Sequence, residues 1–134
     1  MTKIIDIEGI GPVYAQKLID VGIKTVEGLL KAGATPAGRK ELEQKSGISG
    51  ALILEWVNHA DLYRIKGVGQ EYSDLLEEAG VDTVVELSKR VPANLYKKII
   101  ETNMEKKLVR RPPSEKMVAD WVEQAKKLPR VVSY

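Results

Sequence analysis

Apolar residues recur along the chain at the three- and four-residue intervals that are typical of amphipathic helices. Two runs show this spacing most clearly: Leu52, Ile53, Trp56, Val57 and Ala60, and later Met117, Val118, Trp121, Val122 and Ala125. No stretch alternates apolar and polar residues over the length of a strand. The pattern therefore predicts an all-α protein with about eight short helices.

Glycine, proline and threonine residues mark where these helices should begin and end. Pro12 stands where the first turn of a helix tolerates proline, and Gly22 offers the left-handed conformation that commonly ends a helix. Thr25 and Thr35 are placed to cap the next two helices, and Gly47 follows the second of these as a further stop. The first half of the chain thus reads as a series of short helices joined by tight turns.

The sequence contains an internal repeat, because residues 7–29 align without a gap on residues 65–87. The identities that matter most for the argument below are Gly9/Gly67, Gly11/Gly69, Tyr14/Tyr72 and, further along, Trp56/Trp121. This repeat indicates a tandem duplication with halves 1–62 and 63–134. Since a half of about 60 to 70 residues has only a marginal core, we expect the halves to pack as one compact pair.

Each half contains a glycine–apolar–glycine turn that opens a helix, Gly9-Ile10-Gly11 in the first and Gly67-Val68-Gly69 in the second. In such a turn the middle side chain can enter the core while the following amides point outward. Free amides at a helix N-terminus attract anions, and the missing Cβ of the second glycine lets a phosphate approach. The turns are neither dinucleotide fingerprints nor P-loops, since no strand precedes them and no Gly-Lys-Ser/Thr follows. That they merely connect helices remains the alternative.

The segments IEGIGPVYAQKL and IKGVGQEYSDLL resemble the hairpin and second helix of helix-hairpin-helix motifs. Over nearly its full length the chain resembles an uncharacterised bacterial and archaeal family of small helix-hairpin-helix proteins with SAM-like, polymerase-beta-like domains. The resemblance implies two tandem four-helix subdomains that bind the DNA backbone, with a basic side chain shortly after the second glycine. Here Pro12 and Val13 follow Gly11, and Gln70 and Glu71 follow Gly69, so the expected cation is missing and Glu71 opposes a phosphate.

The chain carries 21 basic and 19 acidic residues, and a net charge of +2 does not by itself indicate a polyanionic partner. The basic residues are nevertheless concentrated between positions 89 and 111, where only Glu101 and Glu105 oppose them. This basic stretch consists of Lys89, Arg90, Lys97, Lys98, Lys106, Lys107, Arg110 and Arg111. Its last residues lead into Ser114, where a decayed second hairpin could offer an anion site. A solvated basic helix explains the stretch equally well.

The residue inventory excludes several chemistries. Without cysteine there is no disulfide, thiolate nucleophile or cysteine-ligated metal, and one histidine cannot build a multi-histidine site. We interpret that histidine, His59, as a surface or packing residue. Since no nucleophile pairs with a base, we expect no enzymatic activity, no metal and no organic cofactor.

These observations predict a non-enzymatic module that binds double-stranded DNA through its backbone without sequence specificity. The predicted contacts, besides the basic stretch, are Gly9, Ile10, Gly11, Lys66, Gly67, Val68 and Gly69. Val13 and Glu71 favour the alternative, a protein-interaction scaffold that keeps the fold without binding phosphate. No stretch approaches the roughly 20 apolar residues of a membrane span, and the start of the chain lacks the form of a signal peptide, so we expect a cytoplasmic protein without a membrane partner.

Overall fold

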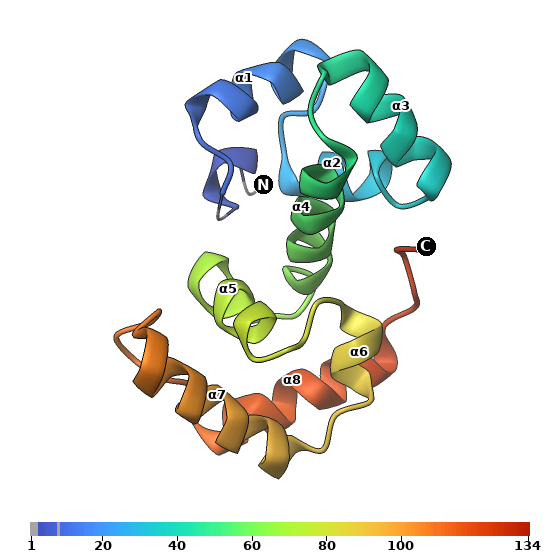
Figure 1. The fold of residues 1–134 in the computed structure, drawn as a ribbon. Coiled ribbons are helices and arrows are strands. Elements are labelled where there is room, and N and C mark those ends of the chain that lie inside the picture. Colours follow the sequence, from blue (N-terminus) through green and yellow to red (C-terminus); the bar gives the residue numbers. More distant parts are fainter. Residues whose placement is uncertain (1–2, 8) are drawn as a thin grey trace. The chain divides into compact units, whose positions relative to one another are not determined.

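Proline, glycine and threonine set most helix boundaries in the structure, a computed structural model that describes residues 3–7 and 9–134. Over this part of the chain the fold is all-helical, as predicted, and its one β-bridge joins Lys3 to Thr25. In chain order the elements are η1 (Ile4–Asp6), α1 (Pro12–Asp20), α2 (Val26–Ala32), α3 (Pro36–Ser46), α4 (Gly50–Leu62), α5 (Gln70–Glu78), α6 (Val84–Ser88), α7 (Pro92–Lys106) and α8 (Glu115–Lys127) (Figure 1). None of the described helices is long and apolar enough to cross a membrane.

The helix ends follow the local sequence signals. The side-chain oxygens of Thr25 and Thr35 each accept a backbone N–H from the third residue of the following helix, at 3.0 and 3.1 Å. Gly22 and Gly47, which follow α1 and α3, adopt left-handed φ angles of 92° and 74°. These positions confirm the predicted caps and stops.

The chain divides into two compact units. Unit 1 comprises Met1–Asp61 together with Val131–Tyr134, and unit 2 comprises Leu62–Arg130. The units differ from the predicted halves at Leu62, which belongs to unit 2, and at residues 131–134, which the repeat assigned to the second half. These residues join unit 1 because their backbone and side chains are bound there, as described below.

The core of unit 1 is formed by apolar side chains from its helices. Leu18 of α1, Leu29 of α2 and Ile53 of α4 are completely buried, and Trp56 of α4 is 1% exposed. His59 is also buried on α4, which agrees with a packing role rather than a surface one. The hydrophobic spacing in the sequence therefore identified the buried face of α4.

In unit 2, helices α6 and α7 pack against α8, and α5 packs against α7. The core of this unit includes Leu76, Leu87, Ile99 and Val118, all completely buried, and Trp121 at 2% exposed. The buried residues of α8 recur at the helical spacing that the sequence shows. Helix α8 therefore forms the centre on which α6 and α7 assemble, and α5 joins them through α7.

The two tryptophans have like environments, as the repeat predicts. The ring of Tyr14 lies 5.2 Å from that of Trp56 at an interplanar angle of 60°, and the ring of Tyr72 lies 5.2 Å from that of Trp121 at 52°. Each tyrosine comes from the first turn of the helix after a glycine turn. The tryptophan and tyrosine thus hold each turn against the core of its own unit.

Candidate nucleic-acid interface

Both glycine turns adopt the same backbone conformation. Their first glycines, Gly9 and Gly67, have left-handed φ angles of 92° and 95°. The middle residues, Ile10 and Val68, are 4% and 5% exposed, and each donates its backbone N–H to the carbonyl three residues earlier at 3.1 Å. The predicted entry of the middle side chain into the core is therefore confirmed in both units.

The first glycine of each turn lies against the indole nitrogen of a tryptophan. A Cβ on Gly67 would stand 3.3 Å from Nε1 of Trp121, and a Cβ on Gly9 would stand 3.4 Å from Nε1 of Trp56. The second glycine is different, because Gly69 has an extended backbone with φ −112° and a Cβ there would meet nothing within 4 Å. The first glycine is thus required by the fold, whereas the second leaves open space above the turn.

This contrast gives a matched pair of variants. We expect Gly67→Ala to lower the free energy of unfolding by about 1–2 kcal/mol, because an L residue is strained at a left-handed φ. Gly69→Ala should change it by no more than about 0.5 kcal/mol, since its backbone suits alanine and the space is open. Urea unfolding followed by circular dichroism measures both. Equal destabilisation by the two variants would contradict the different roles of the two glycines.

The N-terminus of α5 presents amides that the helix cannot use. Its first helical hydrogen bond runs from the amide of Ser73 to the carbonyl of Gly69 at 2.9 Å. In the part of the chain that the structure describes, the amides of Gly69, Glu71 and Tyr72 donate to no acceptor. In α1 the first helical residue is Pro12, which has no N–H to donate. The amides of Gly69, Glu71 and Tyr72 are therefore available to an anion at the second turn.

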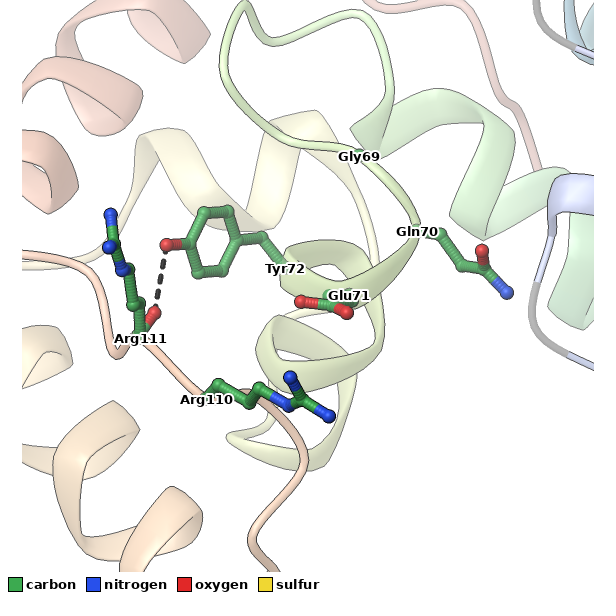
Figure 2. A pocket seen from close by; sticks show the side chains of 6 residues that line it. All are labelled: Gly69, Gln70, Glu71, Tyr72, Arg110 and Arg111. Carbon is green, nitrogen blue, oxygen red and sulfur yellow. Dashed lines mark hydrogen bonds between the residues drawn. The ribbon is translucent and has the colours of Figure 1, made fainter.

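Two arginines lie beside these amides. Arg110 and Arg111 line an open cavity of about 490 Å³ together with Gly69, Gln70, Glu71 and Tyr72 (Figure 2). The hydroxyl of Tyr72 donates to the backbone carbonyl of Arg111 at 2.9 Å, which fastens the segment that carries both arginines to α5. Both arginine side chains are exposed. The structure thus brings the end of the basic stretch to the glycine turn of the same unit.

Glu71 is the unfavourable group in this cavity. Its side chain is exposed on the first turn of α5, and it forms no ion pair with Arg110 or Arg111 in the described structure. A carboxylate at this position repels a phosphate. The two guanidinium groups outnumber it, so the side chains of the cavity keep a net positive charge.

The backbone of the second turn is fixed by α8. The amide of Lys66 donates to Oε1 of Gln124 at 2.9 Å, and Nε2 of Gln124 donates to the carbonyl of Lys66 at 3.1 Å and to Asp120 at 2.9 Å. The side chain of Lys66 lines a second cavity, of about 320 Å³, whose other lining residues are Gly67, Ser114, Lys116, Met117, Asp120 and Trp121. Lys116 is a cation that the sequence reasoning missed. The available signal was its position just after Ser114, which caps α8.

The other predicted cations do not line either cavity. Lys89, Lys97, Lys98 and Lys107 are exposed elsewhere on unit 2. Nη2 of Arg90 donates to the carbonyl of Ala79 at 3.3 Å, which gives this side chain a structural role at the end of α5. Within the predicted basic stretch, Arg110 and Arg111 therefore line the cavity, Arg90 has a structural role, and the four lysines named above are exposed to solvent.

Lys106 is engaged by a carboxylate. Its ammonium group forms an ion pair with Glu78 of α5. The hydrogen bond from Lys106 to Glu78, reinforced by the charge of Glu78, raises the pKa of Lys106 above its ordinary value. The pairing offsets much of the positive charge that Lys106 would present to a polyanion.

The sequence profile of a protein family described as "Domain of unknown function (DUF4332)" matches residues 8–128. The chain belongs to this family. The DUF4332 match includes both glycine turns, both tryptophans and the residues of both cavities. Comparisons with curated proteins and with solved structures gave no significant match.

Proposed function

We propose that this DUF4332 chain is a non-enzymatic module that binds double-stranded DNA through its phosphate backbone. The observation that carries the proposal is the placement of Arg110 and Arg111 in one cavity with the unused amides of α5. Helix N-terminal amides and guanidinium groups are two of the main donors by which proteins hold phosphates. A phosphate over Gly69 can receive hydrogen bonds from both, because no Cβ occupies the space there.

The proposal includes a relationship to helix-hairpin-helix proteins. It is supported by the repeated turn, in which a left-handed glycine precedes a buried apolar residue and a helix begins after the second glycine. On this proposal units 1 and 2 are two subdomains of that type. Unit 2 supplies the stronger phosphate contact, because Arg110 and Arg111 lie beside the N-terminus of α5.

The binding that we propose has no sequence specificity. The available donors are backbone amides, lysines and arginines around an open cavity, and such groups contact phosphates rather than base edges. The side chains of Lys66 and Lys116 border the same turn and can bind neighbouring phosphates of one strand. These contacts position a duplex without reading its bases.

A protein-interaction module is the second candidate function. Val13 is 70% exposed on the first turn of α1, where the resembling motif carries a cation. An exposed valine suits a protein contact better than a phosphate contact. This observation concerns unit 1, whereas the arginine cavity belongs to unit 2.

The experiment that tests the proposal is an anisotropy titration with a generic labelled duplex at about 50 mM and about 200 mM salt. We expect weak binding that falls with salt, with a logarithmic slope of about −0.9 for each phosphate contacted. A second duplex of unrelated sequence should bind equally well. Absence of binding at the lower salt concentration, where electrostatic attraction is strongest, would reject the proposal and leave the protein-interaction function.

A further inference from the structure

Residues 131–134 carry no regular secondary structure, yet their backbone is held by unit 1 on two sides. The amide of Ser133 donates to the carbonyl of Ala34 at 2.8 Å. The carbonyl of Ser133 accepts a hydrogen bond from Nη2 of Arg39 at 2.7 Å. Unit 1 therefore binds both backbone groups of one residue, which is how proteins commonly recognise a peptide segment.

The side chains on either side of Ser133 are bound as well. Val132 is 3% exposed. The hydroxyl of Tyr134 donates to Oδ1 of Asn58 at 2.8 Å, and the Tyr134 ring centroid lies 5.7 Å from the guanidinium carbon of Arg39. An apolar anchor, a backbone clamp and an aromatic contact thus follow one another along the segment.

Arg39 is the centre of this site. Its side chain is buried, with the residue 8% exposed, although it lies on the otherwise polar helix α3. Its Nη1 donates to the carbonyl of Gly33 at 2.8 Å, so the guanidinium group joins the end of α2 to the bound segment. When the segment leaves, Nη2 of Arg39 loses the carbonyl of Ser133 as its acceptor. A replacement ligand that offers a backbone carbonyl restores this hydrogen bond.

We propose that Ala34, Arg39 and Asn58 form a peptide-binding site on unit 1, which residues 131–134 occupy, and that a partner protein binds there by displacing them. The partner presents a short uncharged segment with a β-branched residue, then a residue with its backbone N–H available, then a tyrosine. The site makes backbone contacts at the middle position, and it selects side chains at the flanking positions. The peptide-binding site lies on unit 1, whereas the arginine cavity lies on unit 2, so this proposal is independent of the proposed DNA contact.

The segment can be exchanged as a ligand, because it is short, has no regular secondary structure and ends in Tyr134, which is 60% exposed. Its occupancy is favoured by its covalent link to α8, which keeps the local concentration at the order of millimolar. A partner segment that makes the same contacts and extends beyond them can therefore compete.

The test uses the full chain with Val132→Asp, which releases the segment because an aspartate at this buried position lacks a partner. The probe is the peptide LPRVVSY, which corresponds to residues 128–134. Binding is followed by NMR through the side-chain signals of Arg39 and Asn58. We expect saturable shifts in the variant at millimolar peptide and at least about tenfold weaker binding to the wild-type chain, where the attached segment competes.

A control peptide separates specific from non-specific binding. In the peptide LPRVVPY, proline replaces the residue that corresponds to Ser133 and removes the N–H that Ala34 accepts, so binding should fall at least about tenfold. If Val132→Asp lowers the helicity of the chain, Ser133→Pro in the full chain serves as the released variant, since it removes the amide and the hydroxyl that Ser133 donates to the carbonyl of Ala34. The proposal is overturned by the absence of shifts at about 5 mM peptide, or by equal binding of the two peptides or of the two proteins.

Sedimentation identifies the occupant. We expect the wild-type chain to be a monomer at the concentration of the NMR experiment. A dimer that disappears in Val132→Asp would assign the site to the same segment of a second copy and would overturn the inference of a different partner protein.

Discussion

Duplex binding should fall about 100-fold when Arg110 and Arg111 are both replaced by glutamate. A hydrogen bond to a charged group contributes about 1.5 kcal/mol or more, so the loss of two such contacts costs about 3 kcal/mol, or about two orders of magnitude in affinity. The new carboxylates would also join Glu71 in repelling phosphate. Both side chains are exposed, so the helicity should not change. Anisotropy titration at low salt and circular dichroism measure the two effects.

The matched control is Lys97→Glu with Lys98→Glu, which makes the same change in net charge on α7. These lysines are exposed and line neither cavity, so we expect a much smaller loss of affinity. Equal losses in the two double variants would mean that overall charge alone determines binding, and the arginine cavity would have no special role. Glu71→Lys provides a change in the opposite direction, because it replaces the repelling group with a cation, and it should tighten binding about tenfold.

Replacing Trp121 with alanine should lower the unfolding free energy of unit 2 by about 4 kcal/mol. The side chain is 2% exposed, contacts the ring of Tyr72 and lies under Gly67, so its removal leaves a large cavity and loosens the glycine turn. Chemical unfolding followed by far-ultraviolet circular dichroism measures the loss.

Met104→Ala is the control for this change, because Met104 is 74% exposed on α7 and its truncation should cost no more than about 0.5 kcal/mol. If the two variants unfold at the same denaturant concentration, Trp121 does not anchor unit 2. The result also bears on the internal repeat, because Trp56 occupies the matching position in unit 1.

Local signals in the sequence predicted the helix boundaries of the first half of the chain. A threonine cap such as Thr25 acts within three residues, and a left-handed glycine such as Gly22 acts within one turn, so each can be recognised without knowledge of the fold. The burial of Val68 also followed from its place between two glycines. These features depend on neighbours in the sequence, which is why they could be predicted.

The contacts between distant residues could not be predicted in this way. The bond from Arg39 to Ser133 joins residues 94 positions apart, and the bond from Tyr72 to Arg111 joins residues 39 positions apart. Helical periodicity indicates which face of a helix is buried but not which loop crosses that face. Arg39, a charged residue in a polar helix, carried no sign that it would be buried.

In the candidate site, too, the local features could be predicted and the contacts between distant residues could not. Charge density identified Arg110 and Arg111, and the glycine pattern identified Gly69, but the sequence placed the arginines next to Ser114 rather than next to Gly69. Their approach to Gly69 depends on the hydroxyl of Tyr72, whose bond to the segment follows from packing within unit 2. Likewise, the pairing of Lys106 with Glu78 could not be read from charge counts.

Unit 1 cannot be completed on the ribosome until unit 2 has been synthesised, because Val131–Tyr134 follow Leu62–Arg130 in the chain. Ala34 and Arg39 emerge early, and their partner Ser133 emerges after the whole of unit 2. The contact between Ala34 and Ser133 closes a loop of 99 residues, and the entropy of closure grows only slowly with such lengths. Until then Nη2 of Arg39 lacks the acceptor that the carbonyl of Ser133 supplies, so the order of translation makes the binding of residues 131–134 the last step in building unit 1.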